Sequence, residues 1–245
     1  MRRIVLIFEY IGTDFSGYQV QPEKRTVQGV VERLLSSILD EDVKIYASGR
    51  TDAGVHSLGQ VAHFDTEKQF KLGWLLDKLN SNLPDDISIR EIKETDEGFD
   101  SRFSVKIKTY SYRFYLSRYE RATMRNRALR VNDNVEVSKM QEACKHLVGE
   151  HDFTSFVARK SGKDDFVRTI YSAKINDLSD GLYELEISGN GFLYNMVRII
   201  MGTLIDIGSG RKAPEDMKNI IAGKKRALAG KTVEPHGLYM KSVQY

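Results

Sequence analysis

The order of apolar periodicities along the chain is the feature that most restricts its fold. In residues 3–92, strand-like runs alternate with two stretches in which Leu and Val recur at helical spacing, Val27–Leu39 and Leu72–Leu79. Residues 106–243 repeat a similar order, with a hairpin expected around Ser179–Gly181. Each half is therefore predicted to be approximately β-α-β-β-α-β, a split arrangement that favours antiparallel sheets.

We expect an α+β fold of two packed halves, each a mostly antiparallel sheet with helices on one face. The predicted joint, near Ser101–Lys106, gives an N-terminal half, residues 1–104, and a C-terminal half, residues 105–245. No linker rich in Pro, Gly or Ser separates the halves, so they should pack together. A chain of 245 residues with 41% hydrophobic residues can bury a sizeable core.

Two helix starts carry local signals. Thr26 precedes the first helical stretch and is expected to be its N-cap. Ser138 and Gln141 have the spacing of a capping box, which predicts a helix that Gly149 closes.

A short connection between two predicted strands concentrates charged residues and glycines. Residues 49–56 are Gly-Arg-Thr-Asp-Ala-Gly-Val-His. Asp and Arg are costly to bury, so such a run is unusual in a core and typical of a functional loop. Arg50 and Asp52 lie on one side of an extended chain, and an ion pair between them would keep Asp52 ionised. An ionised Asp52 could be a nucleophile, a base or a metal ligand. The structural alternative is an aspartate that caps the turn and pairs with Arg50.

The distribution of charge is more informative than the formal net charge of +3. Between Arg102 and Arg130 there are nine basic residues and one acidic residue, Glu120, with aromatic side chains between them. This composition favours RNA, because cations bind phosphates and aromatic rings stack on bases. A solvated charged face is the alternative. Within the stretch, Tyr112 and Phe114 are interpreted as ordinary strand residues.

The last five arginines of this stretch lie in a segment with no helical apolar pattern, and two other basic clusters occur later in the chain. We expect the five arginines, the first group, to form a loop that contacts the RNA backbone, and the others to extend that surface. The first group is Arg118, Arg121, Arg125, Arg127 and Arg130; the others are Arg159, Lys160, Lys163, Lys224, Lys225 and Arg226.

Composition also excludes several kinds of site. Cys144 is the single cysteine, which excludes an intrachain disulfide and a cysteine-based metal site. The five histidines lack zinc-like spacing, so no structural metal is predicted. The run Ile4–Phe8 is too short for a signal peptide, and residues 192–207 contain charged side chains, which predicts a core helix rather than a membrane span. We expect a cytoplasmic protein that does not contact a membrane.

Residues 49–56, followed by Gly59-Gln60-Val61 and Phe64, resemble the signature of the TruA family of tRNA pseudouridine synthases. Four further motifs of this family have similar segments in the expected order: residues 103–106 with 108–112, residues 151–156, residues 195–198 and residues 237–239. The sequence departs from the family pattern at Ser57, where Ala is commoner, and at Ile199, where Asn is commoner.

The resemblance implies an isomerase that converts uridine to pseudouridine at positions 38, 39 and 40 of the tRNA anticodon stem-loop. It implies that Asp52 is catalytic and that Tyr110 lies against the target base. Arg50 and Arg198 would bind the substrate and hold Asp52 ionised, and Arg50 would help to extrude the nucleotide. The reaction is an internal rearrangement, so no cofactor is expected. The expected partners are tRNA and a second copy of the chain, since family members are homodimers.

Several alternatives remain open at this point. Asp52 could attack the anomeric carbon of the ribose or abstract a ribose proton. A noncatalytic RNA-binding module would need the basic stretch but not Asp52. A metal-assisted hydrolase would use Asp52 and His56 as ligands. Substitution of Asp52 and chelation of metals would distinguish these functions.

Overall fold

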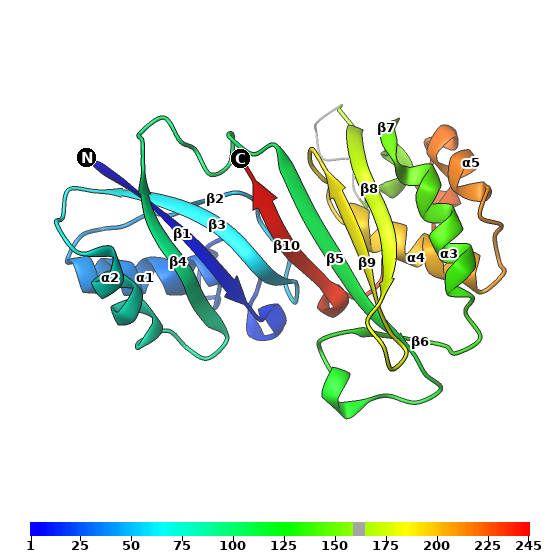
Figure 1. Cartoon of the computed structure of the whole chain (residues 1–245), viewed down its shortest axis with the longest axis horizontal. Helices are drawn as coiled ribbons and strands as arrows, with labels where there is room; N and C mark the ends of the chain where they lie inside the picture. Colours follow the sequence, from blue (N-terminus) through cyan, green and yellow to red (C-terminus); the bar gives the residue numbers. More distant parts are fainter. Residues whose placement is uncertain (159–164) are drawn as a thin grey trace. The chain divides into compact units, whose positions relative to one another are not determined.

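The computed structural model describes residues 1–158 and 165–245, and the chain forms two compact units (Figure 1). The first unit contains Met1–Lys106 together with Tyr239–Tyr245, and the second contains Ile107–Leu238. The end of the chain therefore belongs to the first unit, whereas the division expected from the sequence kept residues 105–245 together. The reason is strand pairing, because the last strand pairs with a strand of the first unit.

The first unit has the β-α-β-β-α-β order that the periodicities predict. Its sheet has the strand order β4-β1-β3-β10, and β2 pairs with β3. All of these pairs are antiparallel except β10 with β3, which is parallel. The elements are β1 (Arg2–Tyr10), α1 (Val27–Leu39), β2 (Tyr46–Ala47), β3 (His56–Thr66), α2 (Leu72–Asn80), β4 (Ile87–Thr95) and β10 (Leu238–Gln244).

The core of the first unit lies between its sheet and its two helices. Leu6 of β1, Leu35 of α1 and Leu75 of α2 are all fully buried in one cluster. Both helices therefore cover the same face of the sheet, as predicted. The side chain of Thr26 accepts a hydrogen bond from Gly29 N at 3.3 Å, which confirms the predicted N-cap of α1.

The second unit is built on an antiparallel sheet of strand order β5-β9-β8-β7, with β6 parallel to β5. The predicted hairpin is confirmed as β8 and β9, whereas the short strands β6 and β7 have no clear sequence pattern. The elements are β5 (Ile107–Leu116), β6 (Leu129–Val131), α3 (Val137–Cys144), β7 (Gly149–Asp152), β8 (Val167–Asp177), β9 (Leu182–Gly189), α4 (Met196–Gly208) and α5 (Asp216–Gly223).

Helix α4 is the apolar helix predicted for residues 192–207, and most of its side chains are buried. It packs closely on the segment before β10, since a Cβ atom at Gly202 would lie 2.0 Å from the carbonyl oxygen of Lys231. Thr203 Oγ1 accepts a hydrogen bond from Gly230 N at 2.9 Å at the same contact. Among the described residues, no helix has the length and apolar character needed to cross a membrane.

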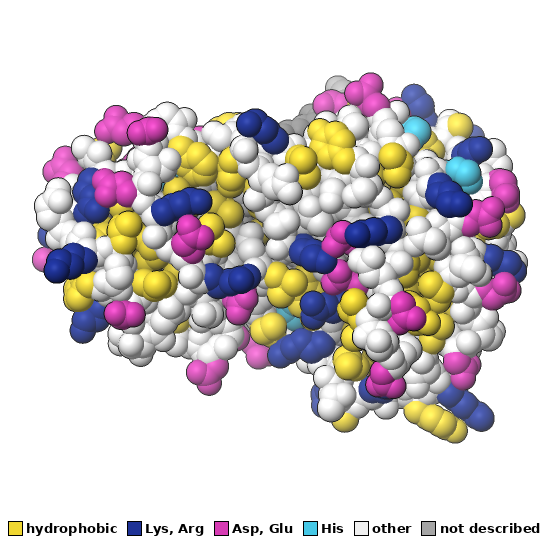
Figure 2. Space-filling model, viewed as in Figure 1, with side chains coloured by type: hydrophobic (Ala, Val, Ile, Leu, Met, Phe, Trp, Pro, Cys, Tyr) yellow, Lys and Arg dark blue, Asp and Glu magenta, His cyan; other side chains and the backbone are white. Residues whose placement is uncertain are grey.

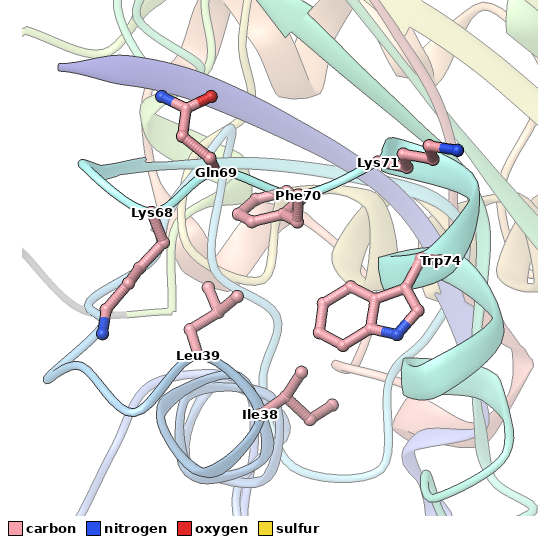
Figure 3. Close-up of a pocket in the computed structure, with 7 residues that line it drawn as sticks. All are labelled: Ile38, Leu39, Lys68, Gln69, Phe70, Lys71 and Trp74. Atoms are coloured by element: carbon pink, nitrogen blue, oxygen red, sulfur yellow. The ribbon is translucent and has the colours of Figure 1, made fainter.

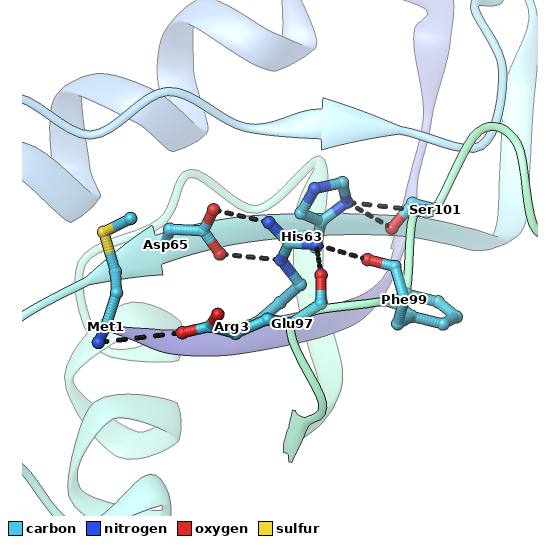
Figure 4. A network of polar contacts seen from close by, with 7 residues as sticks. All are labelled: Met1, Arg3, His63, Asp65, Glu97, Phe99 and Ser101. Carbon is cyan, nitrogen blue, oxygen red and sulfur yellow. Dashed lines mark hydrogen bonds and ion pairs between the residues drawn. The ribbon is translucent and has the colours of Figure 1, made fainter.

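The segment that follows β4 is fixed to the strands of the first unit (Figure 4). Arg3 of β1 donates two hydrogen bonds of 2.7 Å to the carboxylate of Asp65, and this guanidinium lowers the pKa of Asp65. Arg3 also donates to the carbonyl oxygens of Glu97 and Phe99. A single bidentate arginine therefore joins β1, β3 and the segment that leads out of the unit.

Candidate active site

The charged loop predicted to be functional connects β2 to β3 in the first unit. Buried hydrogen bonds fix its beginning: Ser48 N donates to Val61 O at 2.8 Å, and Ser48 Oγ donates to Gln60 Oε1 at 2.8 Å. The amide of Gln60 donates in turn to Gly49 O at 2.9 Å. Because Ser48 and Gln60 are fully buried, these bonds hold the loop to β3 in a water-free environment.

The centre of the loop is a tight turn that starts at Asp52. Val55 N donates to Asp52 O at 3.1 Å, and Gly54 has a φ of 79°. A glycine with positive φ at the third position is what a type II turn requires. The residue before the turn is also fixed, since Thr51 Oγ1 is 2.8 Å from Tyr10 OH and Thr51 O accepts from Tyr18 N at 3.0 Å. The backbone on both sides of Asp52 is therefore held in place.

Exposure differs sharply along this loop. Thr51, Val55 and His56 are buried, Asp52 is half-buried, and Arg50 is exposed. The loop thus buries its anchoring residues and leaves the arginine and part of the aspartate accessible. Within the described part of the chain Arg50 forms no ion pair, so the expected pair with Asp52 is not formed here.

Tyr110 and Arg198 belong to the second unit. Tyr110 lies on β5 opposite Ile187 of β9, is half-buried, and contacts Phe192 edge-on with 5.0 Å between ring centroids. The neighbouring residues Tyr112 and Phe114 also lie on β5 and are fully buried, which confirms their interpretation as ordinary strand residues.

Arg198 lies in the first turn of α4 and is half-buried. Its Nε donates to Val233 O at 2.7 Å, and its Nη1 donates to Asn195 Oδ1 at 2.7 Å. Asn195 has a φ of 60°, in the left-handed region, at the start of the helix. These bonds fix the orientation of a guanidinium that the sequence places among apolar residues.

Comparisons with known proteins bear on the same segments. The model of a family described as tRNA pseudouridine synthase matches residues 6–104 and 143–245, which include the Asp52 loop and α4. The chain belongs to the tRNA pseudouridine synthase family. Members are isomerases, so this chain is an enzyme of that class.

Individual relatives of this family match over their whole length. The tRNA pseudouridine synthase A of Anoxybacillus flavithermus is 46% identical over 246 residues, which cover 100% of this chain and 99% of the relative. The proteins of the same name from Brevibacillus brevis and Bacillus subtilis are each 44% identical over 245 residues. These matches cover 100% of both chains for Brevibacillus brevis and 99% of both for Bacillus subtilis.

In this member of the tRNA pseudouridine synthase family, the ring of His56 is packed and hydrogen-bonded inside the first unit. Its Nδ1 accepts a hydrogen bond from Gly12 N at 2.9 Å, and its ring lies 4.6 Å from that of Tyr239. The side chain is fully buried. Because Gly12 N occupies the lone pair of Nδ1, the proton of the neutral ring lies on Nε2 and neither nitrogen offers a lone pair to a metal. This geometry argues against the hydrolase alternative in which His56 binds a metal.

Sequence reasoning missed the two residues that fix the loop from the side of β1, Tyr10 and Gly12. The only sequence pattern that points to them is a glycine two residues after the tyrosine at the end of β1. The segment just after them contains Phe15 and Tyr18. Both side chains are buried, at 3% and 2% exposure, so this segment is a packed turn.

The smaller basic clusters differ in how their side chains are used. Lys224 pairs with Asp152 at 2.8 Å, and Arg226 donates to the carbonyl oxygens of Ala229 and Gly230. These two side chains therefore have structural partners. The cluster of Arg159, Lys160 and Lys163 lies outside the described residues.

A pocket of about 330 Å³ lies in the first unit between α1, α2 and the segment before α2 (Figure 3). Its walls include Ile38, Phe70 and Trp74, and no carboxylate or histidine lines it. It contains none of the predicted site residues, and the titratable groups in its lining are the amines of Lys68 and Lys71.

Proposed function

We propose that this chain converts uridine to pseudouridine at positions 38, 39 and 40 of the tRNA anticodon stem-loop, with Asp52 as the essential residue. The observation that carries the proposal is the loop between β2 and β3, whose hydrogen bonds fix the backbone around the half-buried Asp52. Catalysis by a positioned carboxylate depends on such preorganisation, because small displacements of the reacting group are costly. The full-length similarity to proteins named tRNA pseudouridine synthase A supports the same reaction.

The reaction balances without an external reactant. The bond from C1′ of the ribose to N1 of uracil breaks, the base turns, and a bond from C1′ to C5 forms. C5 loses a proton and N1 gains one, so nothing is oxidised and no group is donated. We therefore propose that no cofactor takes part. Asp52 either attacks C1′ or removes a ribose proton to start the cleavage.

The remaining site residues bind and orient the nucleotide in this proposal. Tyr110 provides a face on which the uracil stacks, and its contact with Phe192 fixes the ring. Arg50, exposed at the end of the loop, helps to extrude the target nucleotide, a step that costs a few kcal/mol. Arg198 binds the substrate through its fixed guanidinium. We further propose a cytoplasmic homodimer that binds the anticodon arm of tRNA.

The test is formation of pseudouridine on unmodified tRNA that carries uridine at positions 38, 39 and 40. Release of tritium from C5-labelled uridine follows the reaction, and chemical mapping locates the product. With EDTA present, the unaltered protein should form product at these positions, and Asp52→Asn should lower the rate by at least about 10³-fold. The matched control, Asp42→Asn, removes an exposed carboxylate of the same unit and should retain the rate.

Each failure has a distinct meaning. Tight tRNA binding without product from the unaltered protein would support the noncatalytic module. Activity that EDTA abolishes would support metal-assisted chemistry. Product at other positions would refute the anticodon assignment while leaving the role of Asp52 intact. Thermal unfolding and tRNA affinity of Asp52→Asn should match the unaltered protein, which would show that only the chemical step is lost.

A further inference from the structure

The segment between β5 and β6, residues 117–128 and here called the arm, extends beyond the strands of the second unit (Figure 1). It contains the short 3-10 helix Ala122–Met124 and four arginines, with Glu120 as its only acidic residue. It lies outside the residues that the family model matches. The arm is therefore a strongly basic surface whose role the family assignment does not supply.

Part of this charge fixes the arm to the unit. Arg121 donates to the carboxylate and to the carbonyl oxygen of Asp180 in the turn between β8 and β9. The carboxylate of Glu120 accepts from Tyr115 OH at 2.7 Å and from Arg130 Nε at 2.8 Å. The one acidic group of the arm is thus paired with Tyr115 and Arg130 rather than with Arg118 or Arg125.

Two arginines of the arm have guanidinium groups that are available to bind another molecule. Arg118 and Arg125 are exposed, and within the described part of the chain their guanidinium groups form no hydrogen bond or ion pair. The guanidinium of Arg118 lies 5.4 Å from the ring centroid of Tyr119, whose side chain is 70% exposed. Over the face in Figure 2, basic and acidic side chains are interspersed.

We propose that the arm binds the backbone of RNA, with Arg118 and Arg125 contacting phosphates and Tyr119 stacking on a base. An acidic protein surface would also attract the arginines. However, an exposed tyrosine beside an unpaired guanidinium is the combination that binds a base and its phosphate together. The inference rests on the proposed function, which supplies tRNA as the RNA.

The test measures the salt dependence of tRNA binding in an Asp52→Asn background, so that no turnover occurs. Each phosphate contact contributes roughly 0.7–0.9 to the slope of log affinity against log salt. Arg118→Ala with Arg125→Ala should therefore make the affinity loss between 50 and 200 mM salt about tenfold smaller. The matched control, Arg211→Ala with Lys218→Ala, removes the same charge from the exposed turn after α4 and from α5 and should keep the original slope.

A second pair of variants tests stacking. Tyr119→Ala should weaken tRNA binding by about 5- to 100-fold without changing the salt slope, whereas Tyr119→Phe should bind normally. These side chains are exposed, so the variants should unfold at the same temperature as the parent protein. Unchanged slope and unchanged affinity in the arginine variant would overturn the inference and favour a protein partner. Because binding is measured without catalysis, this result would be separate from any failure of the pseudouridine assay.

Discussion

His56 and His63 of β3 use their imidazole rings in the same way. The Nδ1 atom of His56 accepts from Gly12 N at 2.9 Å, and that of His63 accepts from Ser101 N at 3.2 Å. A nitrogen that accepts a hydrogen bond carries no proton, so both contacts require neutral rings. The motif around His56 identifies the loop from sequence, but the acceptor role depends on residues distant in the chain and could not be predicted.

This arrangement predicts how stability depends on pH through His63. Burial, with a smaller effect of the Arg3 charge, lowers the pKa of His63 below its ordinary value of 6.5. The unfolded chain therefore binds this proton at a higher pH than the folded chain, so stability should fall as pH decreases below about 6.5. The melting temperature should fall more between pH 7.5 and 5.5 for the unaltered protein than for His63→Gln. His146→Gln serves as the control, and parallel curves for all three proteins would refute the prediction.

At the scale of elements, the sequence predicted a helix cap correctly where the hydrogen-bond partner of the capping side chain is close in the chain. Thr26 caps α1 as its sequence position predicts. The capping box predicted for Ser138 and Gln141 is wrong, because α3 starts at Val137 after Glu136 and has no side-chain cap. Gln141 Oε1 instead accepts from Ile175 N of β8 at 2.6 Å. A tertiary hydrogen bond has replaced the local one, and periodicity within a single segment carries no information about it.

Two glycines allow a matched test of how the elements hold the Asp52 loop. A Cβ at Gly12 would lie 1.9 Å from Val55 O, so Gly12→Ala must push the loop away from the end of β1. We expect a loss of about 1–3 kcal/mol in the free energy of unfolding. We also expect a rate loss of roughly 10²-fold, because the carboxylate is displaced. Urea denaturation and tritium release measure the two effects.

The control for this pair is Gly73 of α2, where an added Cβ would meet no atom within 4 Å. Gly73→Ala should increase the free energy of unfolding by about 0.5–1 kcal/mol, because glycine is a poor helix former. Its rate should not change. A Gly12→Ala protein with normal activity would show that the contact with Val55 does not position Asp52.

At the scale of the whole molecule, the last strand returns to the first unit, which a division of the chain at one point cannot describe. The order of elements predicted the α+β class and the strands of the first sheet that lie within residues 2–95. The pairing of β10 with β3 joins Tyr239 to His56 and Met240 to Ser57. Such a parallel contact between distant residues leaves no local pattern, so a division by sequence position kept this strand with residues 105–245.

The position of β10 predicts that the last residues of this chain stabilise the first unit. Removal of residues 239–245 takes away the Tyr239 ring beside His56 and the hydrogen bond from Tyr245 OH to Ser101 O at 2.9 Å. It also exposes the edge of β3, which should lower the melting temperature and make the segment before residue 106 sensitive to proteases.

A single substitution keeps this prediction testable if the truncated chain does not fold. Tyr245→Phe removes only the hydroxyl and should cost about 0.5–1.5 kcal/mol in the free energy of unfolding. Gln244→Ala, at the exposed neighbouring position, is the control and should cost less. Limited proteolysis should then detect faster cleavage near Ser101 in Tyr245→Phe alone. Equal cleavage in both variants would mean that packing of the Tyr245 ring on Phe99, at 4.7 Å between centroids, holds the segment without the hydroxyl.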